Sequence, residues 1–346
     1  MEQYINKKYI FEFATEEDGE EISALLEQTA FDGDITLVYA KRPNAFVSVN
    51  KDSIKSAIVI GRNTETNKIV GVGICQIFEM LVDNNKERIA YLGGLRVDKT
   101  ANLNIFSAYK LLENFVIENN VKYTYTTIIE DNIYAQKMLT KKRKFMPEYK
   151  KISDYTVNIY KKNIRFKSNK NIELLKEEEI PKLKKFIEEK TKDIIFFPLN
   201  TFNYKDFYVL KDSNNNICAC GKLTKQMNHK QLIIKRYSKK LQLLKKLSNP
   251  ILNLINLPPF PKENEIINYQ TLSYVLYDNE ICLKDFIKQI SHYIDYAFFV
   301  YGTTKTIKNI YTPINYKSFV YIVDWNKKLN IEEIKKHNIY IECELL

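Results

Sequence analysis

Three strand patterns follow one another in residues 56–97 with no helix pattern between them, and this feature limits the fold more than any other in the chain. The segments SAIVIGR (56–62) and KIVGVGICQIFEMLV (68–82) flank the polar turn NTETN, and ERIAYLGGLRV (87–97) comes next. Runs rich in Val and Ile that are separated by short polar turns indicate strands joined as hairpins. The pattern argues against a simple alternation of strand and helix, and it predicts a mixed, mostly antiparallel sheet.

Helix and strand patterns surround these three strands. Thr15 and the acidic turn after it begin an amphipathic helix whose apolar positions are Ile22, Leu25 and Leu26. A strand precedes this helix, and a helix, a strand, a helix and a closing strand follow residue 97. These segments are YIFEFA (9–14), FSAYKLLENFVIENN (106–120), KYTYTTII (122–129), DNIYAQKMLTKK (131–142) and YTVNIY (155–160).

The second half of the chain repeats this order. ETNKIVGVG and SNNNICACG align at an offset of 148 residues, which matches Ile69 with Ile217 and Gly73 with Gly221 and indicates an internal duplication. We expect one domain at residues 1–162 and a second at 163–346, with a Lys-rich insertion at about 222–262. The predicted elements of the second domain are the strand NIRFK (163–167), the helix ELLKEEEIPKLKKFIEEKT (173–191), the hairpin FYVLKDSNNNICACGKL (207–223), the strand IINYQTLSYVLY (266–277), the helix LKDFIKQISHYI (283–294) and the strands FFVYG (298–302) and FVYIVDW (319–325).

Four consecutive segments of the first half carry a resemblance to a known family. The strand YLGGLRVD (91–98), the helix after it, the strand ending TTIIEDN (126–132) and the helix NIYAQKMLTKKRKF (132–145) resemble the acyl-CoA-binding core of the GNAT superfamily of N-acetyltransferases. The tail RKFMPEYKKISDYTVNIY also resembles bacterial GNAT-like proteins with two such domains in tandem. The resemblance implies an α/β fold of the α+β type: two tandem GNAT-like domains, each a mixed, mostly antiparallel central sheet flanked by helices. It also implies acetyl-CoA as co-substrate.

The resemblance assigns cofactor contacts to the first half. In GNAT folds two parallel strands splay apart and pantetheine lies between them. Gly93 and Gly94 lie inside a strand pattern, where glycine marks a bulge or a close approach. The backbone of Leu95, Arg96 and Val97 would then face the thioester carbonyl and the pantetheine amides. The further residues assigned to cofactor binding are Asn102, Asn104, Ile105, Phe106, Ser107, Ala108, Asn132 and Ala135.

The pyrophosphate loop departs from the family pattern. Ile105 and Ser107 stand where glycines are usual, and Asn102 replaces the usual cation. A helix N-terminus still offers unpaired N–H groups and partial positive charge, so phosphate binding is weakened and not excluded. The corresponding turn of the second half has Asp278 and Glu280, which would repel pyrophosphate. We therefore expect acyl-CoA to bind the first half only.

Catalysis in this family needs a base for the amine and an acid, often tyrosine, for the departing thiolate. The position of that tyrosine is Leu139 here. The resemblance therefore leaves Tyr134 as acid and Glu79 and Glu130 as bases acting through water. Tyr39 and Arg42, in GDITLVYAKRPN (33–44), would contact the acceptor. Each of these five side chains also has a plain reading as a surface or structural residue.

Charge and cysteine content bound the remaining functions. Residues 213–262 contain ten Lys or Arg and no acid, in a chain of net charge +11. This segment could attract an anionic partner, but leucines at helical spacing beneath its lysines favour a solvated face, and no nucleic-acid-binding motif accompanies it. The five cysteines and three histidines form no zinc-ligand set, which predicts reduced thiols and no metal. No membrane span, secretory signal, dinucleotide fingerprint or phosphate loop is present, so we expect a cytoplasmic protein with no membrane partner.

Two functions remain. The first is an acetyl-CoA-dependent N-acetyltransferase that acts on a small-molecule or peptide amine, as a monomer or homodimer. The second is a GNAT-derived binding or scaffold protein without transfer activity, which would recognise an anionic partner through the lysines of 222–246. The strand YLGGLRVD and the helix after EDN favour the enzyme.

Overall fold

The computed structural model describes residues 4–5, 8–28, 35–51, 53–164, 171–199, 203–239, 241–243, 245–246, 261–307 and 314–346. The chain forms two compact units that do not follow its order. Unit 1 holds residues 1–75, 94–112 and 226–268, and unit 2 holds 76–93, 113–225 and 269–346. Unit 1 thus includes the part of the predicted insertion (about 222–262) that follows residue 225, and also the first residues of the strand predicted at 266–277. The division of the chain at residue 162 stays a prediction.

Unit 1 is built on antiparallel pairs β1–β2 and β2–β4 and on a separate pair of β3 with β14. Its helix α1 follows a capping box in which Thr15 and Asp18 bond reciprocally, as the Thr and acidic turn predict. The predicted apolar positions of α1 are buried in the core of the unit. Its elements are β1 (Tyr4–Ile5), β2 (Tyr9–Phe13), η1 (Glu16–Asp18), α1 (Gly19–Glu27), β3 (Ile35–Ala40), α2 (Ala45–Lys51), β4 (Lys55–Asn63) and β14 (Gln231–Tyr237), with parts of β5 (Ile69–Val82), β6 (Asn85–Val97) and α3 (Phe106–Glu118).

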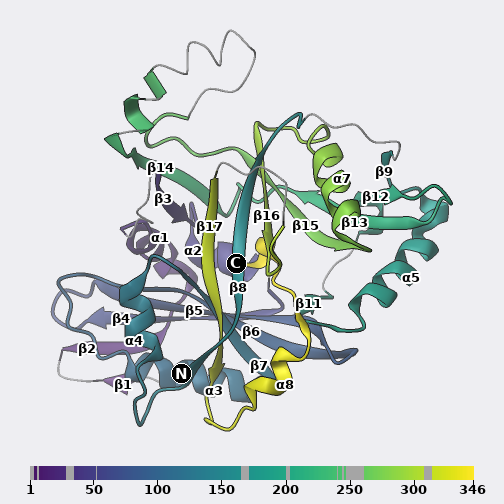
Figure 1. The fold of residues 1–346 in the computed structure, drawn as a ribbon. Coiled ribbons are helices and arrows are strands. Elements are labelled where there is room, and N and C mark those ends of the chain that lie inside the picture. The colour runs from purple at the N-terminus through teal and green to yellow at the C-terminus, as the bar shows by residue number, and fades with distance from the viewer. Residues whose placement is uncertain are drawn as a thin grey trace. The chain divides into compact units, whose positions relative to one another are not determined.

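Unit 2 contains a sheet with the strand order β6-β7-β17-β8-β16-β15-β13-β12-β9 (Figure 1). The pairs β6–β7 and β15–β16 are parallel, and the remaining neighbours on this path are antiparallel. The expectation of a mixed, mostly antiparallel sheet is therefore confirmed. The strands are β7 (Tyr123–Ile129), β8 (Glu148–Lys161), β9 (Ile172–Leu174), β12 (Phe207–Lys211), β13 (Ile217–Thr224), β15 (Tyr269–Tyr277), β16 (Phe298–Thr303) and β17 (Ile314–Asp324), with the short β10 (Ile194–Ile195), β11 (Phe197–Pro198) and β18 (Asn338–Ile339).

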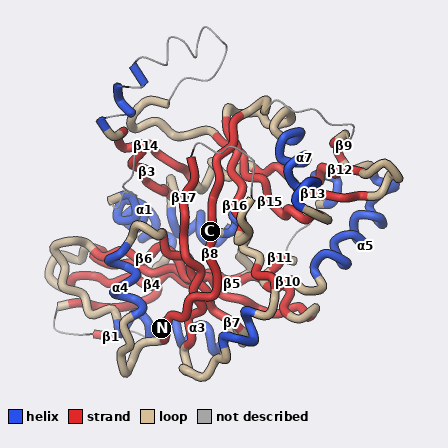
Figure 2. The backbone as a smooth tube through the Cα atoms, viewed as in Figure 1, coloured by secondary structure: helices blue, strands red, loops and turns tan. Residues whose placement is uncertain are grey.

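The predicted helices of unit 2 occur in the predicted order, with shifted bounds: the helix predicted over 283–294 spans Glu280–Ile290, and α8 was not predicted. The helix predicted over 173–191 begins at Ile180, because residues 172–174 form the edge strand β9, and Pro181 suits the first helical turn. Helices α5 and α7 pack on the strands of the second half (Figure 2). The helices are α4 (Ile133–Thr140), α5 (Ile180–Thr191), α7 (Glu280–Ile290) and α8 (Ile331–Lys335), with the 3-10 turns η2 (Glu177–Glu179), η3 (Tyr204–Asp206) and η4 (Cys343–Leu345).

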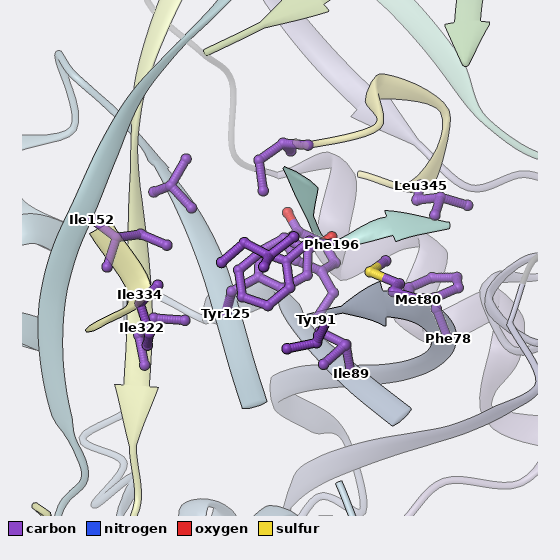
Figure 3. Packing of buried hydrophobic residues seen from close by; sticks show 14 of the residues in the cluster. Phe78, Met80, Ile89, Tyr91, Tyr125, Ile152, Phe196, Ile322, Ile334 and Leu345 are labelled. Carbon is purple, nitrogen blue, oxygen red and sulfur yellow. The ribbon is translucent and has the colours of Figure 1, made fainter. Parts of the chain in front are cut away.

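The core of unit 2 is aromatic where β6, β7 and the segment after β10 meet. The ring of Tyr125 stacks on Phe196 at 5.7 Å and lies 5.2 Å from that of Tyr91 (Figure 3). Ile322 of β17 and Leu345 of η4 belong to the same cluster. The C-terminal segment is therefore part of this core.

Two sequence predictions fall wholly or partly outside the described residues. The strand predicted at 163–167 has no strand residue at 163–164, and 165–167 are not described. The leucines at helical spacing after residue 241 lie mostly in the undescribed 247–260. Among the described residues no helix is long and apolar enough to cross a membrane.

Candidate functional site

The parallel strands β6 and β7 pair over a short ladder. Residues Ile89–Tyr91 face Tyr123–Tyr125, whereas both strands continue beyond these residues. At the end of the ladder the Thr126 hydroxyl donates to the carbonyl of Leu92 at 2.6 Å, and the hydroxyls of Tyr91 and Thr127 lie 3.0 Å apart. Side-chain bonds thus take over from main-chain bonds where the ladder ends. Whether the strands open further around a ligand, as the resemblance implies, stays a prediction.

Gly94 interrupts β6 three residues beyond Tyr91. Its φ of +61° lies in the left-handed region, and a Cβ built there would come 2.5 Å from Cδ1 of Ile74. Glycine is therefore required by both conformation and space. Leu95, Arg96 and Val97 follow this irregularity within the strand and are partly or fully exposed. The residues assigned to the thioester and pantetheine come directly after a distorted backbone.

The loop before α3 is anchored by Leu103, a residue that the sequence analysis missed. Its Cδ1 atom would lie 2.5 Å from a Cβ at Gly71 and 3.3 Å from one at Gly61. Two glycines in neighbouring strands therefore leave room for one leucine. Gly61 and Gly71 were the sequence signal for this contact, because a glycine within a strand indicates that another part of the chain comes close to its backbone. Leu103 fixes the loop that contains Asn102 and Asn104.

The first turn of α3 leaves two main-chain donors. The side chain of Asn104 accepts from the N–H of Phe106 at 3.1 Å, and Ile105 accepts from Tyr109 through its carbonyl at 3.0 Å. Among the described residues, no acceptor bonds the N–H groups of Ser107 and Ala108. Helix N-termini with such donors attract anions. Ser107 and Ala108, in the first turn of α3, therefore have main-chain N–H groups that are available to an anion.

Asn132 begins α4 and caps it. Its side-chain oxygen accepts from the N–H of Ala135 at 3.1 Å. Gln136 donates from Nε2 to the carbonyls of Ile129 at 3.1 Å and of Glu130 at 2.6 Å. These bonds hold the start of the helix against the end of β7. The structure thus brings Glu130, Asn132 and Ala135 together, with polar groups of Asn132 and Ala135 already bonded to each other.

The three side chains assigned to proton transfer lie in different settings within unit 2. Tyr134 is 78% exposed on α4. Glu79 pairs with Lys86 at 2.6 Å, across the hairpin of β5 and β6. Glu130 is partly buried, and Leu139 at the family's tyrosine position is buried in its place. Glu79 is therefore engaged in an ion pair with a lysine, and Tyr134 is exposed to solvent.

The two residues assigned to the acceptor lie in unit 1. Tyr39 is in β3, with the Lys41 Nζ 5.3 Å from its ring centre. Arg42 holds Glu27 through two bonds of 2.6 Å and exchanges main-chain bonds with the side chain of Gln231. Arg42 therefore joins α1 to the start of β14. Among the described residues no group of three His, Cys, Asp or Glu side chains is arranged to hold a metal ion.

Comparison with known proteins finds likeness in structure and none in sequence. No protein-family model matches the chain, and no curated protein matches it significantly. The Saccharomyces cerevisiae N-myristoyltransferase with bound myristoyl-CoA matches with a TM-score of 0.56 and 11% identity, over 98% of this chain and 90% of that chain. A glucosamine N-acetyltransferase region of a fungal multi-domain β-N-acetylglucosaminidase matches with a TM-score of 0.57 and 12% identity, over 91% of this chain and 38% of that chain. Identities this low establish a shared fold alone.

Proposed function

We propose that this chain, which has the fold of the GNAT-like acyltransferases, transfers an acetyl group from acetyl-CoA to an amine by direct attack in a ternary complex. The observation that carries the proposal is the short parallel ladder of β6 and β7 followed by the left-handed Gly94. Beyond Tyr91 the described residues of β6 form no further ladder pairs with β7, and the backbone is left-handed at Gly94, so this edge of β6 has main-chain groups that the β6–β7 ladder does not use. Such groups can bind an extended ligand and stabilise an oxyanion.

The cofactor residues divide into two roles. The backbone of Leu95, Arg96 and Val97 would bind the thioester carbonyl and the pantetheine amides. The N–H groups of Ser107 and Ala108 would bind the pyrophosphate, because they have no acceptor among the described residues. Asn102, Ile105 and Phe106 would shape the loop between these two points, with Asn104 capping it. Asn132 and Ala135 would keep the start of α4 in place.

Proton transfer completes the reaction. The amine nitrogen attacks the thioester carbonyl and loses a proton, and the thiolate of CoA leaves and gains one. Glu79 and Glu130 remain the proposed bases and Tyr134 the proposed acid. Tyr39 and Arg42 remain the proposed acceptor contacts. The tandem division into 1–162 and 163–346 also belongs to this proposal.

The alternative of a polyanion-binding protein receives less support. Several cations of 222–246 are engaged within the chain: Lys225 pairs with Asp295 at 2.6 Å, and Lys245 donates to the Pro261 carbonyl at 2.6 Å. Lys222 lies 5.4 Å from the ring centre of Tyr274. Lysines held by carboxylates, carbonyls and rings are poorly arranged to bind phosphates. This reading is therefore not favoured over the enzyme.

Thermal unfolding with increasing acetyl-CoA tests the proposal, because a ligand that binds only the folded state raises its apparent stability. At a ligand concentration of about 100 times Kd the gain is about 2.7 kcal/mol. Desulfo-CoA and CoA report whether the acyl group contributes. No shift at several millimolar acetyl-CoA would exclude the proposed site.

The matched variants are Ser107→Glu and Ser213→Glu. A glutamate in the first turn of α3 is compatible with the helix dipole but repels pyrophosphate. Ser213 lies exposed in the turn between β12 and β13 and receives the same substitution. We expect Ser107→Glu to abolish the shift and Ser213→Glu to keep it.

A further inference from the structure

The second half contains a strand pair with the same irregularity as the first. Strands β15 and β16 are parallel, with Tyr269–Thr271 facing Phe298–Val300. Tyr274, three residues beyond Thr271, has a φ of +56°. The register of β13 against β15 shifts between Cys220 and Lys222, next to this point. A tyrosine rarely adopts such a conformation, so the surroundings of Tyr274 must hold it.

The distorted backbone at Tyr274 binds a buried carboxyl group. The N–H of Tyr274 donates to Oε2 of Glu342 at 2.7 Å, and the hydroxyl of Tyr340 donates to the same oxygen at 2.8 Å. The other oxygen, Oε1, accepts from the N–H of Glu344 at 3.2 Å. Glu342 is 3% exposed. Three donors from two segments therefore converge on one carboxyl group inside the protein.

The segment that carries Glu342 is fastened on both sides of this carboxyl group. Before it, β18 pairs in parallel with β10, and the Thr304 hydroxyl donates to the carbonyl of Ile339 at 2.7 Å. After it, η4 contacts both β15 and β16. A Cβ at Gly302 of β16 would lie 1.7 Å from the Tyr155 hydroxyl oxygen and 3.0 Å from the Cβ of Cys343, so glycine leaves room for both side chains. The segment thus lies against the strand pair beyond its ladder.

The neighbouring helix start does not offer a phosphate site. The side chain of Asn279 accepts from the N–H groups of Ile281 at 3.0 Å and Cys282 at 3.1 Å. Glu280 supplies a negative charge to the first turn of α7. The dipole of α7 is therefore satisfied by the chain itself. A carboxylate at Tyr274 and a capped helix together replace the parts that a CoA ligand would need.

We propose that the backbone turn at Tyr274 is a carboxylate-binding site whose ligand is Glu342 of the same chain. On the proposed function, the pair β6–β7 of the first half binds a thioester oxygen. The corresponding pair β15–β16 of the second half would bind a carboxyl oxygen of the protein. The site itself stands on the three hydrogen bonds to Glu342 and does not require that acetyl-CoA binds anywhere. Small carboxylates are then the ligand class that should enter when the Glu342 side chain is removed.

Chemical rescue of Glu342→Ala tests this site. We expect the variant to unfold at a lower temperature than the native chain. Sodium propionate should raise that temperature with a saturable dependence on concentration, more strongly as the pH falls because the buried site favours the neutral carboxyl group, and sodium chloride at equal ionic strength should not. Glu332→Ala, which removes an exposed carboxylate from α8, should show no such effect. An equal response to both probes, or none in a folded variant, would overturn the proposal.

A second measurement uses the native chain and so does not depend on the folding of any variant. In an NMR titration, the chemical shift of the Tyr274 amide proton should move downfield as Glu342 ionises. The midpoint of this change should equal the midpoint of the titration curve of the side-chain carboxyl carbon of Glu342. An amide shift at Tyr274 that ignores this titration would contradict the assignment. Failure of the acetyl-CoA titration above would end the proposed function and leave both of these results unchanged.

Discussion

Gly94 in β6 and Tyr274 in β15 share one backbone conformation at the same place beyond a parallel ladder. Their φ angles are +61° and +56°, and each residue comes three positions after the last one paired with the neighbouring parallel strand. The repeated position supports an internal duplication more directly than the match of Ile69 with Ile217. Both of those residues nevertheless begin a strand, β5 and β13. A glycine occupies this position in the first half of the chain, and a tyrosine held by a carboxyl group occupies it in the second half.

Gly94→Ala tests the requirement for a left-handed residue. We expect a loss of about 1–3 kcal/mol of unfolding free energy, because alanine is strained at this φ and its Cβ would collide with Ile74. Gly73→Ala is the matched control, since its Cβ would meet Leu112 at an ordinary 3.8 Å. Urea unfolding measures both. Equal stability of the two variants would show that β6 tolerates a side chain at this point.

Leu103→Ala tests the anchor of the loop before α3. The side chain fills the space left by Gly61 and Gly71, so its loss should cost about 1–2 kcal/mol, less than a fully buried leucine. The loop should then hold the first turn of α3 less firmly, and the stabilisation by acetyl-CoA should decrease. Leu243→Ala removes a leucine that is 62% exposed and should change neither quantity. If the variant loses stability but is stabilised by acetyl-CoA as much as the native chain, the position of this loop does not affect acetyl-CoA binding.

The bond between the Tyr91 and Thr127 hydroxyls should stabilise the end of the β6–β7 ladder. Tyr91→Phe and Thr127→Val each remove it, and a double-mutant cycle isolates its contribution from the other effects of each change. We expect a coupling of about 0.5–1.5 kcal/mol, the usual range for such a bond. Additive losses would mean that the two hydroxyls do not depend on each other.

Glu342 should make stability depend on pH. Burial raises its pKa from the ordinary 4.5 to about 7, although the bonds from Tyr274, Glu344 and Tyr340 favour the ionised form. The folded state therefore binds the proton more tightly than the unfolded state. The contribution is fully present below about pH 4.5 and is lost as pH rises through about 7, to a total of about 3 kcal/mol.

The phenol groups around Glu342 do not titrate in that range. The pKa values of Tyr125, Tyr155, Tyr301 and Tyr340 are all raised well above the usual 10, chiefly by burial, so these phenols stay protonated. Glu342→Gln should remove the fall in stability between pH 4.5 and 7. The same slope in the native chain and the variant would assign it to another group.

Elements with strong local patterns were predicted correctly. Strands β4, β5 and β6, helix α3 and strand β7 lie within one or a few residues of their predicted ranges. Strand β14 was not predicted, because QLIIKRY lies within a segment characterised by its lysines. Strand β8 extends from Glu148 to Lys161, well before the predicted 155, since alternating polar residues such as Lys151 and Asp154 conceal its first half.

Residues of the candidate site could be predicted from the sequence only where the residue type itself indicates a particular backbone conformation. Gly94 was such a residue, because a glycine within a strand pattern marks a distorted backbone. Tyr274 and Glu342 gave no signal, since tyrosines are common in this chain and an acid near its last residues reads as a surface group. The roles of Tyr134, Glu79, Glu130, Tyr39 and Arg42 stay predictions. Their functions depend on a ligand and not on the packing of the chain.

Strand β17 has a consequence for how the chain acquires its structure. It lies between β7 and β8 and pairs with both, although almost two hundred residues separate it from β7 along the chain (Figure 1). On a ribosome, β7 and β8 therefore leave the exit tunnel long before the strand that joins them has been made. Pairings of such high sequence separation slow folding and leave strand edges exposed in the meantime. Residues 1–162 alone would lack this central strand, so the nascent first half must wait for the second before its sheet can close.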